Sequence, residues 1–230
     1  MSEVEIAKKV KKGGKWISIL LWVVILILVL LIIFFSFFSL ARTVGSSMEN
    51  TLQRGQHTLL FRNRRARNGE IIVFRHTNTH NIKRVIASGG DRLVLSECET
   101  SGRIYIFLYN NGEFLRLDED YLCESNKYDT SRMFSNGRFS RDFLFSAPYI
   151  SKSNTLDHVQ VPESYIITVP DNQFFVLGDN RNNSVDSRRD GFVDRRDIVG
   201  RVRIVVMQDS FLERVLLLFF GRGLDETAAA

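Results

Sequence analysis

The stretch WISILLWVVILILVLLIIFFSFFSLA, residues 16–41, decides the architecture of this chain, because it is apolar throughout and carries no charged residue. About 20 apolar residues suffice for an α-helix to cross a bilayer. A cleavable secretory signal has an apolar region of only about 7–15 residues, followed by a small-residue cleavage site. We therefore expect residues 16–41 to remain in the protein as a transmembrane helix.

The residues on either side of this span predict its orientation. Residues 1–15 contain a group of lysines, Lys8, Lys9, Lys11, Lys12 and Lys15, and the nearest basic residues after the span are Arg42 and Arg54. The positive-inside bias then places a basic N-terminus in the cytoplasm and the bulk of the chain outside.

The net charge of +5 is consequently a topology signal more than a sign of nucleic-acid binding. The segment RNRRAR, residues 62–67, is the densest other basic cluster. A solvated loop or a contact with anionic lipid headgroups is favoured there over a nucleic-acid contact, and no nucleic-acid partner is expected.

After the span the pattern changes to short runs of β-branched and aromatic residues separated by Gly, Asn and Asp, which is typical of β-strands. The runs occupy residues 58–61, 70–74, 82–86, 92–95, 104–109, 165–169, 174–177 and 198–206. Their close spacing predicts a mainly β, antiparallel domain. We expect its core in two parts, residues 42–97 and 163–208.

Residues 98–162 alternate polar and aromatic residues without a clear period, which predicts a lobe inserted into the β core. Cys98 and Cys123 fall in this lobe, and the sequence leaves open a disulfide or two free thiols. So few thiols suggest no metal site. In the last segment, 209–230, the apolar run 211–220 is too short to span a bilayer, and it predicts a helix that lies at the membrane interface or packs on the β domain.

Just after the span, GSSMENTL at Gly45 to Leu52 offers Ser47 as a nucleophile, which needs a neighbouring base. None of the four histidines lies in a motif that suggests this base, and we expect them to be exposed. Lys83 is a better candidate, because strand alternation places it and Val85 on one face, where apolar neighbours can desolvate it. Burial lowers a lysine pKa, and a neutral amine can accept a proton. A lone strand lysine more often extends to water.

A third stretch, FFVLGDNRNNSVDSRRDGFVDRRDIVGRV at residues 174–202, is a turn-rich segment between two predicted strands. Ser184 can hydrogen-bond into a site there. Ion pairs that rigidify the loop are expected among Asp179, Asp186, Arg181 and Arg188. The stretch lacks the DxDxDG rhythm of a calcium loop, so no metal is expected here either.

The ordered set GSSMENTL, NGEIIVF, IKRVIASGGD and GDNRNNSVDSR resembles the four motif blocks of type I bacterial signal peptidases, membrane-bound proteases with a serine–lysine dyad. The resemblance implies that Ser47 is the nucleophile, Lys83 the general base, and Ser184 the residue that orients the lysine amine. It also implies supporting ion pairs behind the site, formed by Asp179 and Asp186 with Arg84 and Arg188.

The chain departs from the family pattern at three positions. Asn50 and Gly89 stand where the family usually has proline, and Gly45 stands where some members have a serine that helps to bind the oxyanion. Without that serine, the Ser47 backbone N–H or the Ser46 hydroxyl has to supply the hydrogen bond.

The resemblance implies a function and a location. The function is removal of signal peptides from secretory preproteins by cleavage after small residues, of the Ala-x-Ala type, with pockets lined by Val44, Met48 and Ile86 and with no cofactor. The location is the lipid bilayer of the bacterial cytoplasmic membrane, with the catalytic domain on the extracytoplasmic side. Two alternatives stay open: a related serine–lysine protease with another substrate, and a catalytically weak, membrane-anchored β module.

Overall fold

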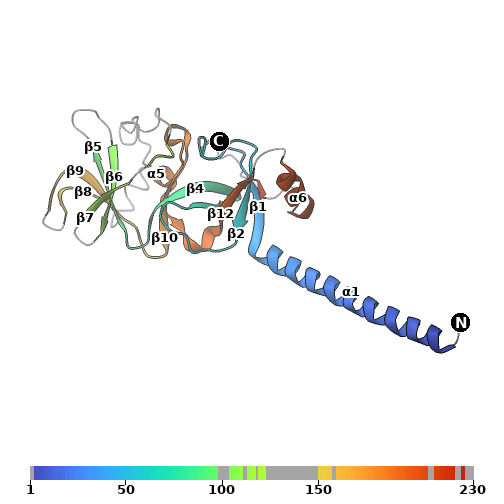
Figure 1. The fold of residues 1–230 in the computed structure, drawn as a ribbon. Helices are drawn as coiled ribbons and strands as arrows, with labels where there is room; N and C mark the ends of the chain where they lie inside the picture. The colour runs from blue at the N-terminus through green and yellow to red at the C-terminus, as the bar shows by residue number, and fades with distance from the viewer. Residues whose placement is uncertain are drawn as a thin grey trace. The chain divides into compact units, whose positions relative to one another are not determined.

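The computed structural model describes residues 3–97, 104–110, 113–117, 119–122, 150–156, 159–206, 210–220 and 224–225. The chain divides into two units, one that ends at Phe38 and one that begins at Ser39. The first unit is helix α1, Glu3–Phe37 (Figure 1). Its segment Trp16–Phe37 is long enough to cross a membrane and has a mean hydropathy of 3.5, which agrees with the predicted anchor.

The helix ends before the predicted span does. Strand β1, Phe38–Arg42, follows α1 without an intervening residue. Leu40 and Ala41 are each only 1% exposed within the β unit. The predicted span included these two residues because buried strands and membrane spans are both rich in apolar side chains.

The β unit contains an eight-stranded sheet with the order β11-β10-β4-β3-β12-β2-β1-β13. Its further strands are β2 His57–Phe61, β3 Ile71–His76, β4 Thr79–Ser88, β10 Gln173–Leu177, β11 Val193–Asp194, β12 Ile198–Val206 and β13 Leu224–Asp225. β4 pairs antiparallel with β3 and β10, and β12 pairs antiparallel with β2 and β3, whereas β1 and β13 are parallel.

A second sheet of five antiparallel strands has the order β7-β6-β5-β9-β8. Its strands are β5 Arg92–Glu97, β6 Ile104–Asn110, β7 Glu113–Arg116, β8 Ile150–Leu156 and β9 Val159–Thr168. The predicted lobe boundary at residue 98 therefore falls between two strands, β5 and β6, that pair along their length. The mainly antiparallel β fold is confirmed, and the question of a disulfide lies outside the described residues, as Cys98 and Cys123 do.

Strand β4 contributes to three separate hydrophobic clusters. Ile86 packs in the cluster between the two sheets, Val85 in a cluster with β3 and β10, and Ile82 in a cluster with Met48 and Leu52. These β4 residues are no more than 2% exposed. A side chain on this strand is therefore carried by a close-packed backbone that moves little.

Helix α6, Phe211–Phe220, matches the C-terminal helix predicted from the sequence. It docks on the β unit through Leu216 and through Glu213, whose Oε1 lies 2.6 Å from Nδ1 of His57. The expectation that the histidines are exposed is wrong for His57, which is 8% exposed because it pairs with this distant carboxylate. Contact of the helix with the membrane interface stays a prediction.

Candidate active site

The serine predicted as nucleophile lies in the turn between β1 and β2. Within this turn the backbone N–H groups of Thr51 and Leu52 donate to the carbonyl of Met48, at 3.1 and 2.8 Å. Met48 and Leu52 are fully buried, and both pack in the cluster that contains Ile82 of β4. The apolar residues at these two positions thus fix the turn, and with it the backbone of Ser47, against the strand that carries Lys83.

The Lys83 amine and the Ser47 hydroxyl meet in this buried position. Lys83 Nζ lies 2.8 Å from Ser47 Oγ and donates to the carbonyl of Ile82 at 3.0 Å. Lys83 is 3% exposed and Ser47 is 9% exposed. Burial disfavours the charged form of an amine. The arrangement therefore places a buried amine within hydrogen-bond distance of a buried hydroxyl.

The loop from Gly178 to Arg188 makes hydrogen bonds to the turn between β1 and β2 that carries Ser47, which we call the nucleophile turn. The Asn180 N–H donates to the carbonyl of Ser47 at 2.9 Å, and its side-chain amide donates to the carbonyl of Ser46 at 3.1 Å. The side-chain amide of Asn183 donates to Ser46 Oγ at 2.8 Å. These contacts of Asn180 and Asn183 were not predicted, although both residues lie in the block GDNRNNSVDSR.

Gly178 brings this loop close to the turn. A Cβ atom at residue 178 would lie 2.2 Å from Ser184 Oγ and 2.6 Å from the carbonyl oxygen of Ser47. Neither contact is possible without moving the loop or the nucleophile turn, so the site requires glycine here.

Ser184 lies beside this glycine, and its buried hydroxyl makes no hydrogen bond of standard geometry, although it lies by the Asp186 carboxylate and helps to lower the pKa of that group. The predicted hydrogen bond between Ser184 and the Lys83 amine is thus not formed in the structure. The orienting role of Ser184 stays a prediction.

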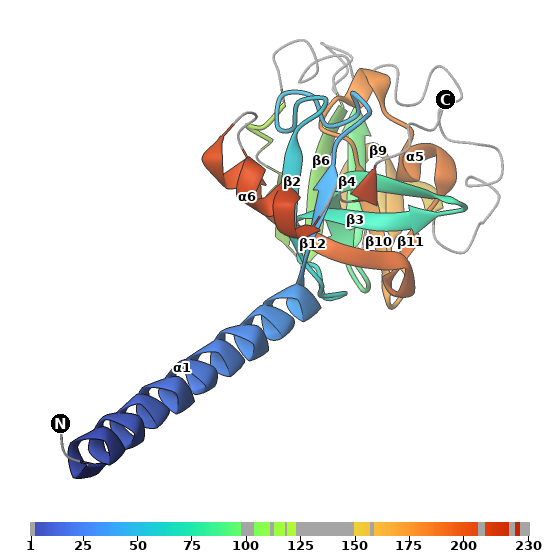
Figure 2. The ribbon, with the colours of Figure 1, turned by 90° about the vertical axis from the view of Figure 1, so that its right-hand side faces the viewer.

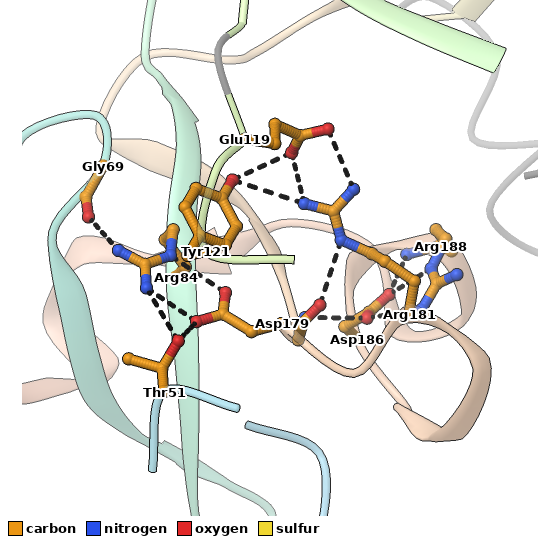
Figure 3. Close-up of polar contacts among 10 residues, drawn as sticks. Thr51, Gly69, Arg84, Glu119, Tyr121, Asp179, Arg181, Asp186 and Arg188 are labelled. Carbon is orange, nitrogen blue, oxygen red and sulfur yellow. Dashed lines mark hydrogen bonds and ion pairs between the residues drawn. The ribbon is translucent and has the colours of Figure 1, made fainter. Parts of the chain in front are cut away.

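Behind the site, Asp186 and Arg188 form an ion pair inside the loop (Figure 3). Arg188 donates from Nε to Asp186 Oδ1 at 2.7 Å and from Nη2 to Oδ2 at 2.8 Å, and the Gly178 N–H donates to the same carboxylate at 3.0 Å. Burial alone would raise the pKa of Asp186, but the guanidinium and the backbone N–H hold that pKa below its ordinary value. Asp186 also caps the short helix α5, Ser187–Asp190.

Asp179 and Arg84 form a second, two-pronged ion pair between the loop and β4. Arg84 donates from Nε and Nη2 to the two carboxylate oxygens at 2.9 and 2.6 Å, and from Nη1 to the carbonyl of Gly69 at 2.8 Å. Thr51 of the nucleophile turn donates to the same carboxylate. This carboxylate thereby ties together the loop, the turn that carries Ser47 and the strand that carries Lys83.

A third cluster was not predicted from the sequence. Arg181, which was expected to pair within the loop, instead pairs with Glu119 (Figure 3). The Tyr121 hydroxyl donates to Glu119 at 2.8 Å, and the Tyr121 ring lies 3.9 Å from the Arg84 guanidinium carbon. Burial and the adjacent Glu119 carboxylate raise the pKa of Tyr121. Glu119 and Tyr121 belong to the segment predicted as an inserted lobe, whose aperiodic sequence carried no signal of this contact.

The structure explains two of the departures from the family pattern. Asn50 has a φ of 89°, which the ring of proline cannot adopt. At Gly89 a Cβ would lie 2.8 Å from the backbone nitrogen of Asn172 and from the carbonyl oxygen of Pro170. Proline at either position is incompatible with this backbone.

The residues predicted to line substrate pockets differ in exposure. Val44 is half-buried and keeps accessible surface, whereas Met48 and Ile86 are 0% and 2% exposed and pack in core clusters. A direct substrate contact by Met48 or Ile86 stays a prediction. In the described part of the chain, no group of three or more His, Cys, Asp and Glu side chains is placed to hold a metal ion.

Comparison with known proteins gives a consistent family. The family model described as signal peptidase, peptidase S26, matches residues 15–207. Signal peptidase I of Bacillus caldolyticus is 34% identical over 203 residues, which are 85% of this chain and 91% of that protein. The probable signal peptidase I-2 of Synechocystis is 32% identical over 168 residues, which are 68% of this chain and 57% of that protein.

The matches differ in how much of each relative they include. Signal peptidase I S of Bacillus subtilis is 29% identical over 138 residues, 60% of this chain, and again 57% of that protein is covered. The chain therefore spans little more than half the length of this relative and of the Synechocystis relative. A crystal structure of a signal peptidase I from Enterococcus faecalis aligns with a TM-score of 0.34 at 23% identity, covering 60% of this chain and 97% of that one.

Proposed function

Because the chain belongs to the signal peptidase family, peptidase S26, we propose that it is a membrane-bound serine endopeptidase that removes N-terminal signal peptides from secretory preproteins. The observation that carries the proposal is the 2.8 Å contact between Lys83 Nζ and Ser47 Oγ in a buried site. A serine hydroxyl needs such a neighbouring base to become a nucleophile.

In the proposed reaction, Ser47 Oγ attacks the carbonyl carbon of the scissile peptide bond while neutral Lys83 takes the hydroxyl proton. The tetrahedral intermediate collapses to an acyl-enzyme as the ammonium of Lys83 gives its proton to the leaving amine. Lys83, again neutral, then takes a proton from a water molecule that attacks the ester. The mature protein leaves first and the signal peptide second, and Ser47 recovers its proton.

The oxyanion of the intermediate requires hydrogen-bond donors close to Ser47. We assign this role to the backbone N–H of Ser47, with the Ser46 hydroxyl as a second donor, since Gly45 has no side chain to contribute. Ser46 Oγ accepts from Asn183, and a hydroxyl that accepts one hydrogen bond still has its own proton to donate. Ser184 is proposed to accept a hydrogen bond from the Lys83 ammonium when it forms.

The proposed substrates are preproteins whose signals end in Ala-x-Ala. Their small side chains fit shallow pockets beside the nucleophile turn, where Val44 has accessible surface. The helix α1 would anchor the enzyme in the bacterial cytoplasmic membrane as a single span, with the lysine-rich N-terminus in the cytoplasm and the β unit on the extracytoplasmic side. A signal peptide held in the same bilayer is presented at a raised effective concentration.

The test is cleavage of a precursor with an Ala-x-Ala signal by the purified full-length chain in detergent. Ser47→Ala removes the nucleophile, and Lys83→Met removes the base but keeps the volume of the buried side chain. We expect both variants to lose cleavage to the background rate. Trapping of an ester between the signal peptide and the enzyme, detected by mass spectrometry, is expected for the parent alone.

The matched control is Ser36→Ala, because the exposed Ser36 hydroxyl donates to the carbonyl of Ile32 within α1, at 2.7 Å, and belongs to neither the dyad nor its ion pairs. This variant should cleave as the parent does. Cleavage that survives in folded Lys83→Met would overturn the dyad mechanism. A parent that cleaves another membrane-bound precursor but not this one would point to the related protease with a different substrate, and a parent inert toward every precursor to the non-catalytic module.

A further inference from the structure

Six arginines lie in two segments that are far apart in the sequence and that meet on the β unit; we call them the arginine rim. Arg62, Arg64, Arg65 and Arg67 lie in the loop between β2 and β3, and Arg195 and Arg196 lie in the short helix η2, Arg195–Asp197, before β12. The four loop arginines are exposed, and the side chain of Arg196 is 87% exposed. None of them takes part in the dyad or in the ion pairs behind it.

The two segments meet around two adjoining hollows. Arg65 and Arg195 line a hollow of about 430 Å³, together with Gly89 and Asn172. Arg64, Arg195 and Arg196 line a second one of about 310 Å³, which also includes Asn172. Arginines of both segments thus line the same two hollows. The planar donors of a guanidinium group suit the oxygens of a phosphate group.

The carboxylates near the rim leave a positive excess. Asp171 lines the larger hollow, Asp194 lines the smaller one, and Asp197 follows the rim in the sequence. Asp91 accepts hydrogen bonds from Asn68 of the loop and from Ser88 beside the larger hollow, so four carboxylates accompany six guanidinium groups. Asp194 Oδ1 lies 3.5 Å from Arg196 Nε in an exposed pair, which is a weak interaction. Glu70, at the end of the loop, is engaged by Arg201 and Arg203.

The strand pairing places the rim at the end of the β unit at which β1 begins. The Thr43 N–H donates to the carbonyl of Gln56, so β1 and β2 run antiparallel and the start of β1 lies beside the end of β2, just before Arg62. Arg201 of β12 lies opposite Phe61 at the end of β2. Figure 2 draws the loop after β2 and the turn before β12 at this end of the unit.

This end of the unit is also where the chain leaves the proposed membrane span. α1 ends at Phe37 and β1 begins at Phe38, and consecutive Cα atoms are only about 3.8 Å apart. A basic surface at the covalent junction with a membrane span is held next to lipid headgroups by the connection itself. That position separates this rim from the basic patches by which proteins recruit a soluble polyanion.

We propose that the arginine rim binds the phosphate groups of anionic phospholipids in the membrane that holds α1. The inference rests on the membrane anchoring given under the proposed function, and it is independent of catalysis. Binding through the rim sets which side of the β unit faces the bilayer. It thereby limits the rotation of the active site about the junction with the span.

The proposal is tested with the full-length chain in lipid nanodiscs, one set of phosphatidylcholine alone and one that contains phosphatidylglycerol. Hydrogen exchange of the amides in residues 62–68 and 194–197 is followed by mass spectrometry. We expect exchange at least about threefold slower in the anionic discs, and the difference should vanish at high salt because the Debye length falls to about 3 Å at 1 M.

Two double variants with the same loss of charge separate the rim from net charge. Arg64→Gln/Arg65→Gln should abolish the response of residues 194–197 to phosphatidylglycerol. Arg54→Gln/Arg189→Gln, which removes two exposed arginines outside the rim, should keep it. Equal exchange in both kinds of disc, or a response that the rim variant retains, would overturn the proposal. So would protection by added oligonucleotide together with none by anionic lipid. Because no step depends on cleavage, a catalytically dead chain gives the same answer.

Discussion

The loop that faces Ser47 has two halves, and different kinds of ion pair hold them. The near half, residues 178–183, contacts the turn that carries Ser47, and the far half comprises residues 184–188. At its far end Asp186 pairs with Arg188, two residues away in the sequence, and the pair closes the loop on itself. At its near end Asp179 pairs with Arg84, 95 residues away, and Arg181 pairs with Glu119, 62 residues away. The far half therefore forms its ion pair within the loop, whereas the near half pairs with groups on β4 and on the segment that follows β7.

This difference concerns function, because the near half is the one that touches the nucleophile turn. Asn180, which donates to the carbonyl of Ser47, lies between Asp179 and Arg181. Both of its neighbours are anchored from outside the loop. We infer that the geometry of the dyad is more sensitive to the long-range pairs than to the local pair, and the following predictions test that inference.

The largest effect on catalysis is expected at Gly178, which lies between Ser184 and the carbonyl oxygen of Ser47. Gly178→Ala introduces a Cβ 2.2 Å from Ser184 Oγ and 2.6 Å from the Ser47 carbonyl oxygen. The turn has to move away from Asn180, and misplacement of a reacting group by about 1 Å can cost about 10²-fold in rate. We expect kcat to fall by about that factor in the precursor assay with KM little changed. A variant with parental kcat would show that the dyad tolerates displacement of this loop.

Asp179→Asn is expected to cause the largest loss of stability. The variant leaves the Arg84 guanidinium, whose side chain is 12% exposed, without its carboxylate. Removal of one partner from a buried ion pair typically costs about 3–5 kcal/mol. Chemical denaturation monitored by circular dichroism measures the free energy of unfolding. A loss below about 1 kcal/mol would mean that the Arg84 pair does not anchor the near half.

Glu119→Gln tests the ion pair between Arg181 of the loop and Glu119, which follows β7 of the second sheet. Glutamine keeps an acceptor for Arg181 but removes the charge, so we expect a loss of about 1.5–3 kcal/mol, the range of hydrogen bonds to charged groups. Asp197→Asn, at an exposed position, is the control and should change stability little. The kcat of Glu119→Gln is then compared with the kcat of Asp186→Asn, both measured well below the unfolding transition. A larger decrease in Glu119→Gln would support the greater sensitivity of the near half. The opposite order would contradict it.

Some residues of the site could be predicted from the sequence and others could not, because some of their contacts are local and others join distant segments. Ser47, Lys83 and the Asp186–Arg188 pair lie in short blocks whose order resembles a known family, so their proximity could be expected. Glu119 and Tyr121 lie where the sequence has no period and matches no family block. Their partners are set by how the chain returns from β7 to the core, and strand propensities do not encode that path.

The fold shows the same limit. The strands of the core were predicted because short runs of β-branched and aromatic residues, separated by Gly, Asn and Asp, are typical of strands. The end of the membrane span was missed because Leu40 and Ala41 are as apolar in a core strand as in a bilayer. His57 was misjudged because its partner, Glu213, is 156 residues away. In each case local pattern was sufficient for the element and insufficient for its long-range contact.

The local pair gives a prediction for acid stability. The folded pKa of Asp186 is below its ordinary value, so its contribution to stability is complete above the unfolded pKa of about 3.9 and is lost as the pH falls below it. Each unit of that depression is worth about 1.4 kcal/mol. Asp186→Asn should therefore be less stable than the parent at pH 7, and the difference should shrink between pH 4 and pH 2. Denaturation midpoints across this range measure it, and a constant difference would contradict the assignment.

The smallest effect is expected at Tyr121, and it separates the two ways in which this residue acts. Tyr121→Phe loses the hydrogen bond to Glu119 but keeps the ring over Arg84, so a loss of about 1 kcal/mol is expected. Tyr121→Leu also removes the cation–π contact, worth about 0.5–2 kcal/mol where it is desolvated. Because Arg84 directly follows Lys83 on β4, only the second change is expected to alter the support of the proposed general base. We therefore expect the acid limb of the kcat profile against pH to shift in Tyr121→Leu and not in Tyr121→Phe. Equal profiles for the two variants would mean that the ring contributes stability alone, and that the near half reaches Lys83 through Asp179 without help from Tyr121.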